Sequence, residues 1–251
     1  MPLVDLSAPI SPDPPEVPDL LRTEVAYEDH AAGARAIEAL FAVGPELLRD
    51  GEGWALETFT HLGTHSSTHV DAPWHYNSTI AGEPAQTIDE LPLDWFYAPG
   101  VVVEATDRDD GEALTAADFE QRLPRPLAER DIVLVHTGRD AYYGQPDYMA
   151  RGPGVTAKAT RWLYDRGVRV MGIDAWGWDA PLHLQAERAR ESGSPGVFWE
   201  AHQADLAYSQ IERLVNLAAL PADGFTVACF PLRLRGGSAA PSRVVAIVPD
   251  D

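Results

Sequence analysis

The sequence predicts a single α/β domain over residues 1–251, and three observations support this fold class. The chain has 45% hydrophobic side chains, which is enough for one sizeable core or at most two small ones. Extended apolar segments alternate with helical ones, which favours an α/β or a mixed α+β arrangement. The connections are short and include no Ser/Gly-rich linker, so one domain is the simplest interpretation.

The N-terminal part begins with a predicted strand and a predicted helix. Residues 3–10 form the strand, and proline ends it because proline cannot donate a ladder hydrogen bond. The prolines concerned are Pro12, Pro14, Pro15 and Pro18. Residues 31–48 have apolar side chains at helical spacing. Gly44 and Pro45 should interrupt or end this helix.

Strands and helices alternate in the middle of the chain. Residues 101–105 and Ile132–His136 are continuous apolar runs rich in β-branched side chains, which is typical of buried strands. Between these two runs, Thr115 is a good N-cap for a helix that extends to Leu123.

Three further strands are predicted in the second half of the chain. A helix ending at Gly167 leads into an apolar strand that reaches Asp174. Near the C-terminus, residues 225–234 and 244–248 form two more strands, separated by the loop RGGSAAPSR. This glycine-rich loop is either a plain connection or a source of backbone donors for a substrate.

Composition excludes some classes of function. Nineteen basic and thirty-nine acidic residues give a net charge of −20, which would repel a phosphate backbone, so we expect no nucleic-acid partner. No apolar run approaches the roughly 20 residues of a membrane-spanning helix, so we expect no membrane association. The N-terminus lacks the pattern of a secretory signal, and Cys229 is the only cysteine, so a cytoplasmic location is expected.

The stretch HLGTHSSTHVDAPWHY, residues 61–76, holds four of the eight histidines. Pro73 disfavours a helix here, so His69 and Asp71 should lie two apart on an extended segment and point the same way. A third ligand would come from His65 or beyond, across a tight turn at two serines. Two imidazole nitrogens and a carboxylate oxygen are a typical ligand set for zinc or another divalent first-row metal.

Other interpretations apply to the remaining histidines. An isolated histidine is usually exposed or is a satisfied core residue, and His30, His136 and His183 are interpreted in that way. Histidine-rich tracts also bind metals nonspecifically in flexible loops. The stretch at 61–76 contains residues of buried type and no consecutive histidines, so it favours a specific metal site.

Residues 65–75, HSSTHVDAPWH, resemble the HxGTHxDxPxH motif of the cyclase family of metal-dependent hydrolases, which includes bacterial kynurenine formamidase and isatin hydrolase. HLGTH at 61–65 matches the first half of the motif, but Ser67 then stands where the family has its aspartate. Starting the motif at His65 recovers every functional side chain and makes His61 the spare histidine. Ser67 then replaces the family's glycine, although serine tolerates a positive φ poorly.

The resemblance extends along most of the chain. VDLSAPIS at 4–11, DIVLVHTG at 131–138, GID at 172–174 and the loop RGGSAAPSR are also similar to the family. The resemblance implies one cyclase-family α/β domain over residues 1–251, with a mixed β-sheet or small barrel packed by helices. It also implies a homodimer or a larger homo-oligomer.

The resemblance further implies a divalent metal, Zn²⁺ or Mn²⁺, with one or two ions. His65, His69 and Asp71 would hold one ion, and Asp71 could bridge to a second ion bound by a histidine and an acidic residue further along the chain. The candidates for that pair are His202 and Glu212. Glu200 competes with Glu212 as the carboxylate. By analogy with the family, His75 is the catalytic general acid and base.

The expected function is hydrolysis of a C–N bond in a small aromatic formamide or cyclic amide by metal-bound hydroxide. A bound metal lowers the pKa of water to roughly 7 and polarises a carbonyl group, which serves this reaction. Trp74 and Trp176 are candidates to stack on an aromatic substrate, although tryptophans also fill cores. One alternative is a metal-assisted lyase or cyclase acting on a small carbonyl compound. Another is a binding protein that holds a small ligand without turnover.

Overall fold

The computed structural model describes residues 1–13, 17 and 22–250. The chain divides into two compact units, one made of Met1–Pro9 with Ser67–Asp251 and the other of Ile10–Ser66. Of the prolines predicted to end the first strand, Pro14, Pro15 and Pro18 lie outside the described residues.

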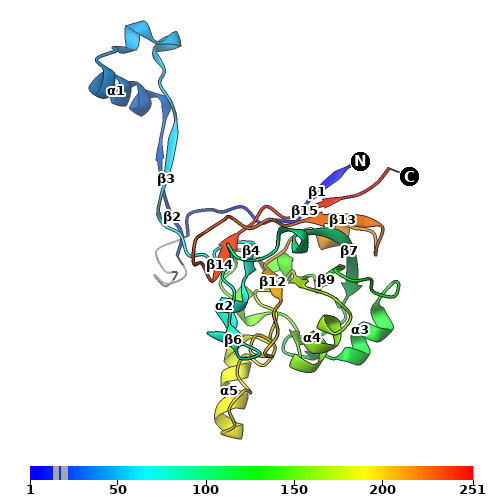
Figure 1. Cartoon of the computed structure of the whole chain (residues 1–251). Helices are drawn as coiled ribbons and strands as arrows, with labels where there is room; N and C mark the ends of the chain where they lie inside the picture. Colours follow the sequence, from blue (N-terminus) through cyan, green and yellow to red (C-terminus); the bar gives the residue numbers. More distant parts are fainter. Residues whose placement is uncertain (14–16, 18–21, 251) are drawn as a thin grey trace. The chain divides into compact units, whose positions relative to one another are not determined.

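A nine-stranded mixed sheet forms the larger unit (Figure 1). Its centre is a parallel block, β7-β9-β11-β12, whose members are Tyr97–Glu104, Ile132–His136, Val170–Ile173 and Ser209–Glu212. Antiparallel strands extend both edges: β13 (Phe225–Ala228), β15 (Val245–Ile247) and β1 (Leu3–Asp5) beside β7, and β4 (His69–Asp71) and β14 (Ala239–Pro241) beside β12. The predicted mixed α/β fold is confirmed.

The parallel block is buried on both faces. Side chains of alternate residues point to opposite sides of a strand, so Val102 and Leu134 join one hydrophobic cluster whereas Val103 and Val135 join another. Burial on both faces explains why β7, β9 and β11 contain continuous apolar runs rather than alternating patterns, whereas β12 is buried with mostly polar side chains.

Helices α3 (Ala116–Arg122) and α4 (Ala157–Tyr164) belong to the second of these clusters through Phe119 and Leu163. Thr115 caps α3 in a capping box with Asp118, as the sequence predicts for its N-terminus. Helix α5 (Leu182–Ser192) and the short helix α2 (Pro73–Tyr76) complete the larger unit.

Two predicted strands end several residues before their expected bounds, and the strand predicted over 244–248 is found as Val245–Ile247. The first strand, predicted over 3–10, ends at Asp5, and beyond it Ser7 forms only an isolated bridge with Leu214. The strand predicted over 225–234 ends at Ala228, because Pro231 cannot continue the ladder and forms only an isolated bridge. The loop RGGSAAPSR contains strand β14, which the sequence does not predict.

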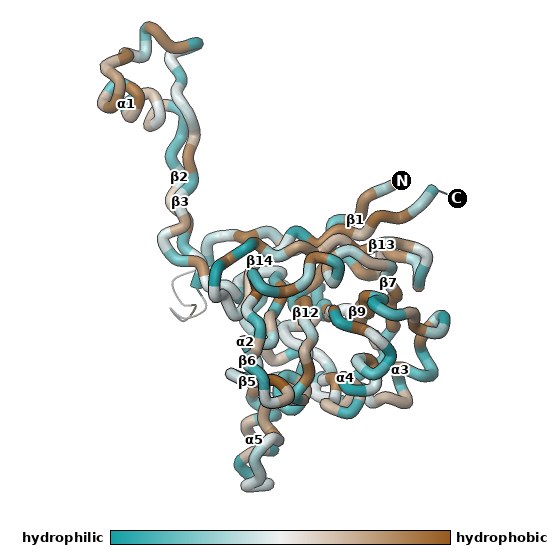
Figure 2. Tube along the Cα trace, viewed as in Figure 1, coloured by the Kyte–Doolittle hydropathy of each residue, from teal (hydrophilic) through white to brown (hydrophobic). Residues whose placement is uncertain are grey.

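The smaller unit contains a two-stranded hairpin, β2 (Glu24–Glu28) and β3 (Leu56–His61), and helix α1 (His30–Phe41). The predicted helix over 31–48 thus ends early, at Ala42 in the left-handed conformation, and Pro45 starts a separate turn. Several large hydrophobic side chains of this unit are exposed, and Figure 2 shows hydrophobic stretches on α1.

The remaining elements are short. The small strand pairs are β5 (Thr79–Ile80) with β6 (Glu83–Pro84), and β8 (Ala113–Leu114) with β10 (Gly154–Val155). The 3-10 turns are η1 (Pro45–Leu47), η2 (Arg49–Gly51), η3 (Leu93–Trp95), η4 (Arg139–Tyr142), η5 (Tyr148–Ala150) and η6 (Leu217–Ala219). Within the described ranges, every helix is too short or too polar to span a bilayer.

Candidate metal centre

Strand β4 sets the position of the candidate metal ligands. It lies between β12 and β14, and all three of its residues are buried. The extended conformation places His69 and Asp71 on the same side of the strand, as the sequence predicts. The antiparallel register pairs His69 with Glu212 on β12, so a third polar side chain comes from the neighbouring strand.

The turn before β4 is held by hydrogen bonds to distant segments. Ser67, at the glycine position of the motif, adopts a positive φ of 54°, a conformation that favours glycine. Its hydroxyl donates to the carbonyl of Ala8 at 2.8 Å. The hydroxyl of Thr68 donates to the carbonyl of Arg213 at 2.5 Å and accepts the N–H of Ala8 at 2.9 Å. These bonds fix the start of β4 against the end of β12.

The ring of His69 is oriented by its own backbone. Its Nδ1 lies 2.9 Å from the carbonyl oxygen of Ser67 and therefore donates to it. The other nitrogen, Nε2, faces two carboxylates, at 3.3 Å from Oδ1 of Asp71 and 3.6 Å from Oε2 of Glu212. The tautomer set in this way leaves Nε2 with a lone pair, which is the form that binds a metal.

His202 approaches the same carboxylates from the other side. Its Nδ1 is hydrogen-bonded to Asp179, whose carboxylate also accepts the N–H groups of Ala201 at 2.9 Å and of His202 at 3.1 Å. The Nε2 of His202 lies 3.7 Å from Oε1 of Glu212 and 4.0 Å from Oδ2 of Asp71. A histidine held by a carboxylate on its outer nitrogen is a frequent feature of metal sites.

The four side chains therefore alternate around a small ring, and this donor set fits a divalent metal. Their nearest N···O distances are 3.3–4.0 Å. Four ligands at about 2.0–2.2 Å from one tetrahedral ion would be separated by about 3.3–3.6 Å, so a small contraction of the ring would suffice. Two buried carboxylates facing each other call for a cation between them.

The electrostatics of the ring agree with its geometry. Burial raises the pKa of Glu212, and the negative charge of Asp71 raises it further. Burial opposes protonation of His202, but its hydrogen bond to Asp179 and the surrounding carboxylates raise its pKa above the ordinary value of 6.5. Without metal, His202 and Glu212 therefore bind protons more readily than usual. A metal ion in the ring would supply positive charge in place of these protons.

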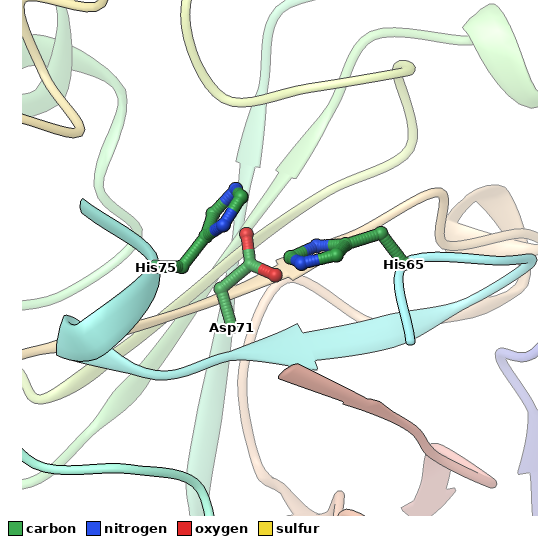
Figure 3. A group of neighbouring side chains, drawn as sticks. All are labelled: His65, Asp71 and His75. Carbon is green, nitrogen blue, oxygen red and sulfur yellow. The ribbon is translucent and has the colours of Figure 1, made fainter. Parts of the chain in front are cut away.

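A second group shares Asp71 with the first. Ligand atoms of His65, Asp71 and His75 all lie within 4.8 Å of one another, and Figure 3 shows the two imidazoles on either side of the carboxylate. His69, Asp71 and Glu212 also meet this distance. The structure thus groups His69 with Glu212 and groups His75 with His65. By geometry, His75 is as well placed to bind a metal as to transfer protons.

Neither of the two competing residues belongs to these groups in the described part of the chain. Glu200, the alternative carboxylate, is exposed and accepts the N–H of Ala157 at 3.2 Å. His61, the spare histidine of the motif, is exposed at the end of β3.

Trp199, one of the aromatic residues near His202 in the sequence that suit stacking on a flat substrate, contacts His202 and His75, although only Trp74 and Trp176 are predicted as substrate contacts. The Trp199 ring stacks on His202 with a centroid distance of 4.6 Å and an angle of 11° between the planes. Its centroid also lies 5.0 Å from that of His75, in an edge-to-face arrangement. The signal in the sequence is its position three residues before His202. Of the two predicted substrate-binding tryptophans, Trp74 is 44% exposed, and Trp176 is partly covered by Arg213.

The other predicted features keep their structural interpretation. His30 and His183 are exposed, and His136 is buried and paired with Glu104. Asp174 is fully buried, and its carboxylate accepts hydrogen bonds from Thr137 and Gly138. These bonds join the ends of β9 and β11, which is a structural role.

Comparison with known sequences agrees with the motif. The sequence model of the family described as "Putative cyclase" matches residues 4–180. A kynurenine formamidase from Salinibacter ruber is 32% identical over 186 residues, which are 73% of this chain and 76% of that protein. An isatin hydrolase from Roseibium aggregatum is 26% identical over 205 residues, which are 75% of this chain and 73% of that protein.

Comparison with solved structures agrees with the fold. Isatin hydrolase A from Ralstonia solanacearum is 26% identical and superposes with a TM-score of 0.74, covering 99% of this chain and 92% of that one. The structure of a potential metal-dependent hydrolase with cyclase activity gives a TM-score of 0.65 at 20% identity, covering 100% of this chain and 99% of that one, and shows the shared fold.

Proposed function

Since the chain belongs to the cyclase family of metal-dependent hydrolases, we propose that it cleaves the C–N bond of a small aromatic formamide or cyclic amide. The observation that supports this most directly is the ring of His69, Glu212, His202 and Asp71, in which two imidazole nitrogens face two carboxylates. The kynurenine formamidase and isatin hydrolase relatives favour an amide as the substrate.

We propose that these four residues and His65 hold the metal, with Asp71 shared between two ions when both are present. The ion would be Zn²⁺ or Mn²⁺, since imidazole and carboxylate ligands suit both. A bound ion supplies a water molecule with a pKa of roughly 7 and polarises the substrate carbonyl. Asp179 positions His202 for this role, and Ser67 positions the chain at the start of β4.

His75 is proposed as the proton-transfer residue. Hydrolysis adds water across the amide, so oxygen bonds to the carbonyl carbon, the C–N bond breaks and the amine nitrogen gains a proton. His75 is partly exposed beside Asp71 and contacts Trp199 edge-on, so it can take the proton from water and return it to the nitrogen. The indole of Trp199, stacked on His202, limits solvent access on that side.

Assembly and location complete the proposal. We propose that residues 1–251 act as one cyclase-family domain, that the protein forms a homodimer or larger homo-oligomer, and that it works in the cytoplasm. Its partner is a small aromatic or cyclic amide, for which Trp74 and Trp176 stay candidate contacts.

Three alanine variants test the roles of the histidines and of Asp71. His75→Ala should retain metal and lose about 10²–10⁴-fold in kcat on a panel of formamides and cyclic amides, because only proton transfer is removed. Asp71→Ala should lose both metal and activity. His61→Ala is the matched control from the same stretch and should lose neither. The measurements are metal content of the purified protein and turnover before and after chelation.

Three outcomes would contradict the proposal. Equal metal loss in His75→Ala and Asp71→Ala would make His75 a ligand rather than the acid and base. Products free of label after turnover in ¹⁸O-water would exclude hydrolysis and favour the lyase reaction. Stoichiometric metal without turnover of any candidate would favour a binding protein.

A further inference from the structure

Arg213 is a buried cation next to the candidate metal centre. It follows Glu212 at the end of β12, and only 8% of its surface is exposed. Its Nε has no hydrogen-bond partner, and no salt bridge of its guanidinium is found within the described part of the chain. Burying a charge costs several kcal/mol. The carboxylates of Glu212 and Asp71 offset part of this cost through space, but neither forms a salt bridge with the guanidinium.

The guanidinium of Arg213 lies flat on an aromatic ring. Its central carbon is 3.5 Å from the ring centroid of Trp176. The Trp176 centroid lies 6.0 Å from that of Tyr148, in an edge-to-face arrangement. Three other arginines of the larger unit also stack on aromatic rings, namely Arg151, Arg166 and Arg169. Each of those three donates hydrogen bonds to a carboxylate or a backbone carbonyl. Among the described stacked arginines, only Arg213 has a guanidinium that donates no hydrogen bond to the protein, so its N–H groups are available to a ligand.

The backbone at Arg213 gives independent support. Its φ is 60°, a left-handed conformation that costs a residue other than glycine about 1–2 kcal/mol. The backbone N–H donates to Ala175 at 3.1 Å, and the backbone carbonyl accepts from Thr68. Any residue could make these two bonds, and glycine would do so without strain. The arginine side chain therefore has a use that offsets both the strain and the burial.

The place of Arg213 links that use to the proposed active site. The segment from Trp176 to Trp178 runs along Glu212 and Arg213: the N–H of Trp178 donates to Oε1 of Glu212 at 3.0 Å, whereas Trp176 lies under Arg213. A Cβ on Gly177 would come within 3.3 Å of the Glu212 carboxylate. An anion bound to Arg213 would therefore lie beside the candidate metal ligand Glu212.

We propose that Arg213 binds a carboxylate group of the substrate, so that the amide substrate is an anion. This inference rests on the proposed function and narrows it to aryl amides that carry a carboxylate. The planar fork of a guanidinium matches the two oxygens of a carboxylate. Without metal, the nearby carboxylates of Asp71 and Glu212 disfavour a dianion such as phosphate relative to a monoanion. Stacking on Trp176 fixes the plane in which the carboxylate must lie.

The test compares substrates and variants in the metal-loaded protein. The substrates are formanilide and the three formamidobenzoate isomers, with the carboxylate at ring positions 2, 3 and 4. The variants are Arg213→Asn, since asparagine accepts a left-handed φ, and Arg213→Lys, which keeps the charge and loses the fork. Arg166→Asn is the matched control, because Arg166 also stacks at 3.5 Å on an indole, that of Trp162, but is exposed.

The wild-type protein should prefer at least one isomer over formanilide in kcat/KM. Arg213→Asn should reduce that preference about 10- to 100-fold, chiefly through KM, as expected for the loss of a buried charge-assisted pair. Arg213→Lys should recover part of the preference, and Arg166→Asn should keep all of it. An unchanged preference in Arg213→Asn, or no preference in the wild type, would overturn the proposal.

Calorimetry separates this inference from the proposed function. Benzoate should bind the wild-type protein more tightly than benzamide, and Arg213→Asn should abolish the difference. If no amide is hydrolysed but this difference is found, the anion site stands and the hydrolase proposal fails. If formanilide is hydrolysed but benzoate binds both proteins equally, or phosphate binds better than benzoate, the hydrolase proposal stands and the anion site fails.

Discussion

Asp179 acts on the candidate metal centre only through His202, and its contribution can be measured directly. Asp179→Asn removes the negative charge that fixes the His202 ring, while its amide oxygen can still accept the N–H of Ala201. We expect a 10- to 100-fold loss of metal affinity, about the size found for such outer partners, in a folded protein. Chelator competition measures the affinity.

Asp205→Asn is the control for this prediction. Asp205 also accepts a backbone N–H, that of Ala81 at 2.7 Å, and within the described residues it forms no hydrogen bond or ion pair with a candidate ligand. Its substitution should leave metal affinity unchanged. Equal losses in the two variants would mean that general destabilisation, and not the orientation of His202, weakens the site.

Ser67 stands where the motif has glycine, in the turn before β4, and its positive φ and its hydroxyl act in opposite directions on stability. Ser67→Ala and Ser67→Gly both remove the hydroxyl that donates to Ala8, but only glycine relieves the positive φ. We therefore expect Ser67→Gly to be more stable than Ser67→Ala by about 1–2 kcal/mol in urea denaturation. At Ser66, whose φ is not positive, alanine should be the more stable of the two. A lower free energy of unfolding for Ser67→Gly than for Ser67→Ala would refute this account of the turn.

At the level of elements, the sequence predicts best those buried strands whose side chains are almost all apolar. Ile132–His136 is found with the predicted bounds. A continuous apolar run of this length, rich in β-branched residues, is typical of a buried strand and too short for most helices. Helix α3 is equally clear, since Thr115 and Asp118 form its capping box. The hydrogen bonds of a capping box join residues three apart in the chain, so the sequence alone can indicate them.

Elements stabilised by distant partners are not visible in the sequence. Strand β12, with the sequence SQIE, is fully buried but has one apolar residue in four, so it carries no strand pattern. Strand β14 contains Pro241 and is tolerated because it lies at the edge of the sheet. Helix α5 buries only Gln185 and so lacks an amphipathic pattern.

The candidate site divides along the same line. The ligands on one short segment, His65, His69 and Asp71, can be chosen from spacing and motif. The convergence of Glu212 with His69 depends on the register between β12 and β4, which only the folded sheet determines. Trp199 and Arg213 reach the site through left-handed backbone positions that no local sequence pattern indicates.

For the whole molecule, pH and metal should act in opposite directions on stability. Burial raises the pKa of Asp174 to about 6, and the pKa values of Glu212 and His202 are also raised. A folded-state pKa above the unfolded one favours the protonated folded protein. The stabilising contribution of these groups is therefore present at low pH and is lost as pH rises through each folded pKa. The metal-free protein should be more stable near pH 5.5 than near pH 8.

Metal binding should reverse this order, because the ligands must lose their protons to bind an ion. With free metal at about 1,000 times its Kd, stability should rise by about 4 kcal/mol near pH 8, or about 8–16 °C in Tm for a chain of this size. Near pH 5.5 the increase should shrink, since protons compete for Glu212 and His202. Scanning calorimetry with and without chelator at both pH values measures the four Tm values.

The net charge of −20 supplies the main competing explanation for the behaviour of the metal-free protein. Lower pH reduces acidic self-repulsion and would also raise Tm. Repeating the four scans in 1 M salt, where the Debye length is about 3 Å, screens surface repulsion and leaves buried groups largely unaffected. A metal-induced increase in Tm that stays larger near pH 8 than near pH 5.5 in high salt assigns the effect to the buried ring. An increase that becomes independent of pH in 1 M salt would assign it to the surface instead, and the ring of His69, Asp71, His202 and Glu212 would lose its role as the metal site.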